Sequence, residues 1–199
     1  MGKKSLSERS NWQTETMVKA TEFEVDFYNV MKNYFKGTCY TIEKKPKDFD
    51  NIYKNIQLPK ETLSEIFNPI DEISRHGIAP DFAISNTETK KRIFGDNKRQ
   101  DGWVEGGTRH DGRGNAHERM CKYFTPGMLK KMRSFGNINL EHLPFWIVLR
   151  GNITRDPCRV REITSWFDDK SQNVFFWRNQ NETEKLISHF EKHIKPILD

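Results

Sequence analysis

The sequence has few cysteines and no long apolar run, and each absence excludes a class of protein. The 199 residues include three cysteines, Cys39, Cys121 and Cys158, which are widely spaced and form no C-x-x-C pair. This usage argues against a disulfide framework and a zinc site, and it predicts buried thiols in a reducing compartment. No stretch approaches the roughly 20 apolar residues of a membrane span. We therefore expect a soluble, cytoplasmic protein with no membrane partner.

Targeting, repeat and phosphate-loop signals are absent as well. The start, MGKKSLSERSNWQ, is basic, but no apolar run follows it, which argues against a secretory signal. The glycine-rich stretch GGTRHDGRG (106–114) lacks the G-K-[ST] ending of a phosphate loop. There is no internal repeat or low-complexity linker. The length suits one domain spanning residues 1–199.

The chain does have a basic charge balance and enough aromatic residues for a core. The formal net charge is +5, the isoelectric point is about 9.0, and aromatic residues make up 12% of the sequence. A basic balance favours a polyanionic partner.

Hydrophobic periodicity predicts an α/β domain in which a central mixed β-sheet is flanked by helices on both sides. The run LPFWIVLRG (143–151) is typical of a strand covered on both faces. Asn115 with Glu118 three residues later resembles a capping box, and Asp156-Pro157 resembles an N-cap with proline at N1. The predicted helices are 14–37, 58–77, 115–124, 128–136, 156–169 and 182–199; the predicted strands are 143–151, 173–178 and a hairpin over 80–98, with a loop at 101–114.

The hairpin places charged residues where an apolar run should continue. Residues two apart in a strand share a face, so Asp96 and Lys98 point one way and Asn97 the other. A turn near 86–90 returns Asp81 to the 96–98 region. Two neighbouring carboxylates repel each other unless something compensates, and Mg²⁺ suits oxygen ligands. This set suits metal-assisted attack of water on a phosphodiester; the alternative is a solvated strand end with an ordinary salt bridge.

Pro80-Asp81 followed by Asp96-Asn97-Lys98 resembles the PD-(D/E)-x-K nuclease signature. GRGNAHER (112–119) is similar to the recognition segment of the EcoRI-like type II restriction endonucleases, and the resemblance runs from Asn11 to the C-terminus. It implies a restriction-endonuclease-like core, with Asp81 and Asp96 as metal ligands and Lys98 as the catalytic lysine.

The chain departs from that family at two positions of the signature. The relatives have Glu where this chain has Asp96, and an apolar residue where it has Asn97. An unpaired amide at Asn97, on the core side, would cost roughly 1–3 kcal/mol. A third acidic ligand would come from an early helix, with Glu65 as a candidate; the alternative for Glu65 is a solvated helix face.

The same resemblance assigns DNA contacts. It implies that the inner AATT is read by a block of five residues and that Arg113 reads the outer pair, which makes the site CAATTG. Arginine can donate two hydrogen bonds to guanine, and the glycine at 114 lets the backbone approach a ligand. The alternative is that Asn115 and Glu118 only cap a helix and the arginines are solvent charges. For His117 we expect a DNA-facing or helix-end residue. The assigned DNA-binding residues are Arg113, Gly114, Asn115, Ala116, His117, Glu118 and Arg119.

These expectations combine into a Mg²⁺-dependent, site-specific deoxyribonuclease that acts on double-stranded DNA as a symmetric homodimer. By resemblance it leaves 5′ overhangs and 5′-phosphates, and a cognate methyltransferase acts on the same site without binding the protein. The rival hypotheses are a repair or structure-selective nuclease on the same core and a catalytically weakened DNA-binding relative.

Overall fold

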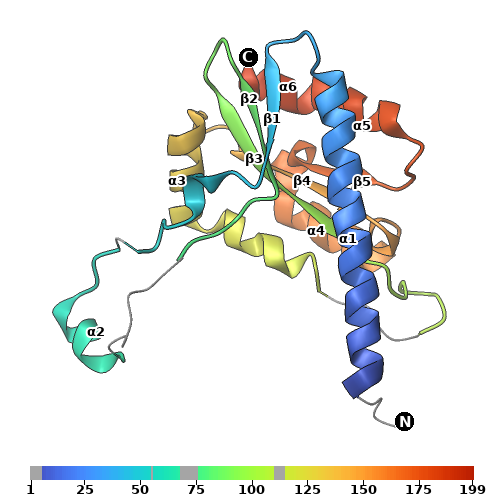
Figure 1. The fold of residues 1–199 in the computed structure, drawn as a ribbon, viewed down its shortest axis with the longest axis horizontal. Coiled ribbons are helices and arrows are strands. Elements are labelled where there is room, and N and C mark those ends of the chain that lie inside the picture. The colour runs from blue at the N-terminus through green and yellow to red at the C-terminus, as the bar shows by residue number, and fades with distance from the viewer. Residues whose placement is uncertain (1–5, 55, 68–75, 110–114) are drawn as a thin grey trace.

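A computed structural model describes residues 6–54, 56–67, 76–109 and 115–199, with side chains from Val18 onward. The chain forms one five-stranded mixed sheet with helices on both faces (Figure 1), which confirms the predicted fold class. The strands are β1 (Tyr40–Lys44), β2 (Phe82–Asn86), β3 (Arg92–Arg99), β4 (Phe145–Arg150) and β5 (Val174–Trp177).

The strands follow one another in the sheet in the order β1-β2-β3-β4-β5. The first three are antiparallel, and β3, β4 and β5 are parallel. The predicted hairpin is confirmed, with Phe82 opposite Gly95. Strand β1 is not predicted by the sequence, because it has only five residues and Tyr40 is the only one that is buried. It is an edge strand that pairs through its backbone.

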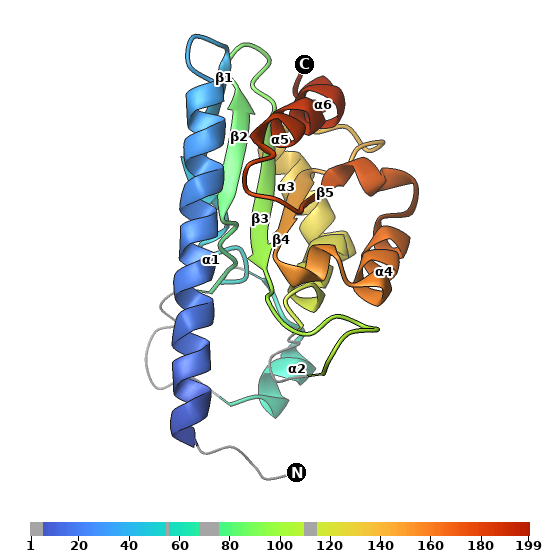
Figure 2. The same ribbon diagram turned by 90° about the vertical axis from the view of Figure 1, so that its right-hand side faces the viewer.

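Helices cover both faces of the sheet (Figure 2). The first helix is longer than predicted, and the last is an α-helix interrupted by one π-helical segment. The helices are α1 (Leu6–Tyr34), α2 (Lys60–Glu65), α3 (Pro126–Gly136), α4 (Pro157–Phe167), α5 (Thr183–His189), the π-helix η5 (Phe190–Ile194) and α6 (Lys195–Leu198), with 3₁₀ helices η1 (Lys47–Phe49), η2 (Glu118–Phe124), η3 (Asn152–Thr154) and η4 (Asp168–Asn173).

Two apolar clusters, one on each face, hold these layers together. One joins α1 and the C-terminal helices to Trp146 and Val148 of β4. The other joins η2, α3 and α4 to Phe145, Ile147 and Leu149 of the same strand. All six residues of β4 are buried, which confirms a strand covered on both faces.

The helix predicted over 58–77 is wrong in extent. Only α2 is helical in this region, Ile66 already has extended backbone angles, and residues 68–75 lie outside the described part of the chain. None of the residues of α2 is buried, and the helix stands away from the sheet in Figure 1. Helices get most of their stability from packing an apolar face, so the periodicity alone does not extend this one.

The helix predicted over 115–124 is present only from Glu118 to Phe124, and this segment, η2, is a 3₁₀ helix. The Asn115 side chain bonds the Glu118 side chain at 3.0 Å, so the reciprocal backbone contacts of a capping box are not formed. The buried residues are His117, Met120 and Tyr123, three apart. A spacing of three is the 3₁₀ period, so one face of η2 enters the core and the other faces outward.

The N-terminus of α4 and the three cysteines are also assigned from the sequence. The cap of α4 is confirmed, because the Asp156 carboxylate accepts from the N–H groups of Cys158 and Arg159 at 2.9 and 3.1 Å. The expectation of buried thiols is wrong for Cys121 and Cys158, which are exposed. None of the helices in the described ranges is long and apolar enough to cross a membrane.

Candidate active site

The hairpin brings the two acids of the nuclease signature together. Asp81 lies just before β2, and its main-chain N–H donates to the Gly95 carbonyl at 2.9 Å and to Oδ1 of Asp96 at 3.2 Å. Glycine is required at 95, because a Cβ there would lie 2.2 Å from the Phe82 ring of β2 and 2.3 Å from the Trp146 carbonyl oxygen of β4. The register of the hairpin therefore sets the spacing of the two carboxylates.

Lys98 lies between these carboxylates. Its Nζ is 2.8 Å from Oδ2 of Asp96 and 3.2 Å from Oδ2 of Asp81, so three predicted site residues converge as expected. Asp96 is 1% exposed, while the side chains of Asp81 and Lys98 are 16% and 17% exposed. The group is therefore buried at one side and open to solvent at the other.

The electrostatics of the site follow from two acids sharing one cation. Burial and the charge of Asp96 raise the pKa of Asp81 to about 6, although Lys98 opposes this shift. Burial works to lower the pKa of Lys98, but the two carboxylates outweigh it, and the pKa lies above its ordinary value. One ammonium thus neutralises only one of two negative charges, which leaves the site short of positive charge.

The donor set fits a hard divalent cation. Carboxylate oxygens suit Mg²⁺, which is commonly bound by one or two carboxylates together with water and substrate phosphates. Among the described residues no group of three or more His, Cys, Asp or Glu is arranged to hold a metal. Asp81 and Asp96 therefore match a site completed by water and phosphate, and they do not match an all-protein cage or a thiolate zinc site.

Asn97 faces away from this group, toward α1. Its main-chain N–H donates to Oδ2 of Asp81 at 2.8 Å, so its backbone supports the acid pair. Its side chain is 7% exposed, and the amide Oδ1 has no hydrogen-bond partner in the structure. The predicted orientation is confirmed, and the amide is unpaired at its oxygen atom.

Glu65, the predicted candidate for a third acid, lies on α2, which stands away from the sheet that carries the two acids (Figure 1). Glu65 is exposed on α2, as its solvated-face alternative predicts. Glu24 of α1 lies close enough to contribute to the raised pKa of Asp81. Glu24, Asp81 and Asn97 line one pocket of about 260 Å³. Sequence reasoning missed Glu24 because a helix-to-hairpin contact has no local signal.

Tyr123 is a second residue that the sequence did not single out. Its hydroxyl donates to Oδ1 of Asp96 at 2.7 Å, and the residue is fully buried on η2. Burial and the charge of Asp96 raise its pKa well above the ordinary value, so the phenol stays protonated and remains a donor. The spacing of His117, Met120 and Tyr123 is the only local sign that this tyrosine points inward.

The predicted DNA-reading segment lies beside this group. Asn115, Glu118 and Arg119 are exposed, and Ala116 is half-buried with its N–H donating to Oε1 of Gln100 at 3.0 Å. Gln100 follows Lys98 by two residues, so β3 leads directly from the acids to the segment. Arg113 and Gly114 lie outside the described residues.

His117 is at a helix end, as predicted, but its ring does not face outward. It is fully buried and stacks on Trp166, with ring centroids 5.4 Å apart and planes 8° from parallel. Nε2 lies 3.3 Å from a Glu162 oxygen without hydrogen-bond alignment, and Nδ1 has no partner. Burial, with Arg159, lowers the pKa of His117. The 3₁₀ period therefore turns this ring into the core, away from the outward side of η2.

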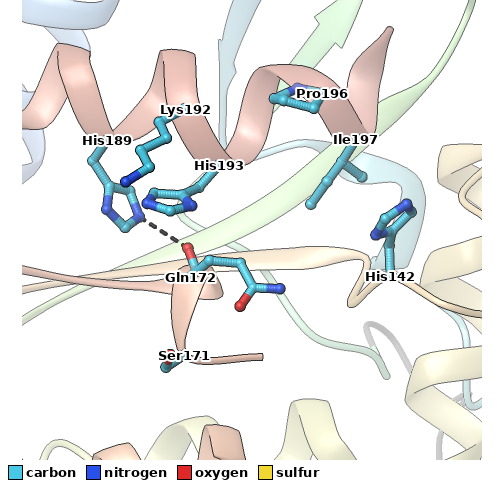
Figure 3. Close-up of a pocket in the computed structure, with 8 residues that line it drawn as sticks. All are labelled: His142, Ser171, Gln172, His189, Lys192, His193, Pro196 and Ile197. Atoms are coloured by element: carbon cyan, nitrogen blue, oxygen red, sulfur yellow. Dashed lines mark hydrogen bonds between the residues drawn. The ribbon is translucent and has the colours of Figure 1, made fainter. Parts of the chain in front are cut away.

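A larger pocket elsewhere is unrelated to the acids. It has a volume of about 420 Å³ and is lined by His142, Gln172, Lys192 and the neighbours shown in Figure 3. Nε2 of His189 contacts the Gln172 carbonyl at 2.9 Å. Burial lowers the pKa of His189 to about 4, and His193 contributes to that direction. This pocket contains no carboxylate.

Comparisons with known proteins agree with the geometry. The family model described as type II restriction enzyme MunI matches residues 1–199. A curated type II restriction enzyme MunI from Mycoplasma sp. is 52% identical over 202 residues, covering 100% of both chains. A solved structure, described as MunI restriction endonuclease in complex with cognate DNA, is 50% identical with a TM-score of 0.81. That match covers 95% of this chain and 98% of the other. The chain therefore belongs to the MunI family of type II restriction enzymes.

Proposed function

We propose that the protein is a Mg²⁺-dependent endonuclease that hydrolyses both strands of duplex DNA at CAATTG and leaves 5′ overhangs and 5′-phosphates. The observation that carries the proposal is Lys98 Nζ within 2.8 and 3.2 Å of the Asp96 and Asp81 carboxylates, next to the outward face of η2. A relative solved with its cognate DNA supports duplex DNA as the substrate.

Asp81 and Asp96 would hold the cation. When bound there, Mg²⁺ supplies charge neutralisation at the scissile phosphate and a lowered pKa for a coordinated water. Lys98 is a hydrogen-bond donor to both acids in the structure. In the DNA complex we assign its ammonium to hold the attacking water or a phosphate oxygen, where its positive charge stabilises the charge that develops on phosphorus.

The exposed side of η2 and the residues before it would read the bases. Asn115, Glu118 and Arg119 present donors and acceptors to solvent, and such groups match base edges in the major groove. Arg113 would read the outer pair, with Gly114 allowing close backbone approach. Ala116 would act through its backbone and methyl group. His117 anchors the segment on Trp166 instead of contacting a base.

A palindromic site requires one active site for each strand. A two-fold homodimer supplies both, and its symmetry matches that of the DNA. The formal charge of +5 favours approach to the phosphate backbone. We place the enzyme in the cytoplasm, where a cognate methyltransferase would modify the same site without binding this protein.

The unpaired amide oxygen of Asn97 is the feature that would favour the alternative hypothesis of a catalytically weakened DNA-binding protein. That amide points toward α1, and the contact of Asn97 with the acid pair is made by its backbone N–H. The departure from an apolar residue therefore costs stability without removing a group from the site. We infer that the active-site geometry is retained.

The test is digestion of a plasmid carrying one CAATTG site, with Mg²⁺ or with EDTA, followed by sequencing of the ends. We expect one pair of cuts within CAATTG that requires Mg²⁺. Cuts at many positions, or at branched DNA only, would instead identify a nuclease of the repair type. Binding without any cutting would identify a weakened DNA-binding relative.

A further inference from the structure

Every oxygen of the Asp96 carboxylate has a partner. Oδ1 accepts from the Tyr123 hydroxyl at 2.7 Å and from the Asp81 N–H at 3.2 Å, and Oδ2 pairs with Lys98 at 2.8 Å. The Asp81 and Lys98 contacts come from the hairpin itself. Tyr123 is the contact that comes from a different element of the fold.

The position of Tyr123 connects two sides of η2. Its ring is fully buried and lies 5.5 Å from the Phe145 ring, so the hydroxyl cannot move without the helix. Glu118 and Arg119 are on the outward side of the same short helix. A shift of η2 against the sheet would therefore move the hydroxyl relative to Asp96.

We propose that Tyr123 is a positioning residue whose hydroxyl fixes the Asp96 carboxylate for metal binding and links the DNA-facing side of η2 to the acid pair. The proposal rests on the proposed nuclease function and adds a residue to that same site. Asp96 is buried, and a buried carboxylate that loses a donor must find another partner or reorient. Lys98 is the nearest donor available, and closer pairing with it would leave the carboxylate turned from the cation.

The test is Tyr123→Phe, which removes one oxygen atom and keeps the ring. The matched control is Tyr34→Phe, because the Tyr34 hydroxyl also donates to a carboxylate, that of Glu191 on η5, at 2.6 Å. Three quantities are measured for each variant. They are Mn²⁺ affinity without DNA by electron paramagnetic resonance, duplex affinity in EDTA, and single-turnover cleavage of CAATTG at saturating duplex with Mg²⁺.

Loss of a residue that orients a metal ligand typically costs about ten- to a hundredfold in metal affinity or activity. We expect Tyr123→Phe to weaken Mn²⁺ binding and slow cleavage by factors in that range, with duplex affinity in EDTA within about twofold of wild type. Because η2 carries Glu118 and Arg119, which we propose to contact the bases, we also expect lower sequence specificity. The cleavage rate of CAATTG should exceed that of sites altered at one inner base by a smaller factor than in wild type. Tyr34→Phe should leave all these values unchanged.

Two results overturn the proposal. The first is a Tyr123→Phe variant with wild-type Mn²⁺ affinity. The second is a loss of Mn²⁺ affinity that Tyr34→Phe reproduces. Failure of the proposed function gives a different result. The wild-type protein would then cut no duplex in Mg²⁺, although the Mn²⁺ affinity of Tyr123→Phe would still be lower than that of wild type.

Discussion

The side-chain oxygen of Gln100 accepts a hydrogen bond of 3.0 Å from the main-chain N–H of Ala116. Gln100 directly follows β3, and its own backbone bonds the Arg150 carbonyl and the Ile153 N–H, each at 3.2 Å. It is 7% exposed and therefore held rigidly. Ala116, within the predicted reading segment, is thus fixed to the strand that carries Asp96 and Lys98.

Gln100→Leu should weaken binding to a CAATTG duplex in EDTA by about tenfold, or roughly 1.4 kcal/mol. Leucine cannot accept the Ala116 N–H, and a buried donor without a partner loosens the segment. Fluorescence anisotropy with a labelled duplex measures this. Gln172→Leu, the same change in the distant pocket of Figure 3, is the control. Equal affinities for the two variants would show that the bond does not organise the DNA-facing surface.

Asp81→Asn should abolish cleavage and stabilise the metal-free protein at pH 8. The pKa of Asp81 is raised from 3.8 to about 6, so proton binding by this group favours folding at low pH, and that contribution is lost as pH rises through 6. Above pH 6 the charged carboxylate costs about 1–3 kcal/mol, which the amide removes. Urea unfolding in EDTA at pH 4.5 and pH 8 measures the difference. The control is Asp169→Asn, at an exposed site, which should leave the free energy of unfolding unchanged at both pH values. A variant less stable than wild type at pH 8 would contradict the account.

Arg113→Lys should cut CAATTG much more weakly while binding non-cognate DNA normally. A guanidinium matches guanine O6 and N7 in one plane, and an ammonium cannot. A bidentate pair contributes roughly 1–3 kcal/mol of discrimination, and a dimer makes it twice. Cleavage of duplexes varied only at the outer pair measures the effect. Arg161→Lys on α4, where the side chain bonds the Pro157 carbonyl, is the control. Should the Arg113 variant keep full preference for C·G, the outer pair is read elsewhere.

His189→Phe should make the free energy of unfolding less dependent on pH between about 6.5 and 4. The folded pKa of His189 is about 4 against an ordinary 6.5, so the unfolded state binds the proton first. Its contribution to stability is complete above pH 6.5 and declines as pH falls toward 4, by about 3 kcal/mol at most. The pH slope of urea unfolding measures it, with the more exposed His142→Phe as control. An unchanged slope in His189→Phe would assign the acid sensitivity to other groups, including His193, which lies 4.9 Å from it.

The sequence by itself determined the hairpin and its three charged residues. A period of two and a short turn are local properties, and they place Asp81 beside Asp96 and Lys98 whatever the rest of the chain does. The continuous apolar run of β4 and the Asp156 cap of α4 are also local, and both are found as expected. The residues that resemble the nuclease signature lie on the hairpin, which is specified locally.

Only the tertiary structure decided what surrounds the acids. Strand β1 forms because an edge of β2 is available. Helix α2 is short, and none of its residues is buried among the described parts of the chain. Helix η2 takes a period of three because three side chains meet the core. That period buries His117 and brings the Tyr123 hydroxyl to Asp96, a contact across 27 residues. Glu24 reaches Asp81 in the same way, through the packing of α1 on the sheet. Such contacts depend on where whole elements pack, and that is a property of the assembled core which no short stretch of sequence carries.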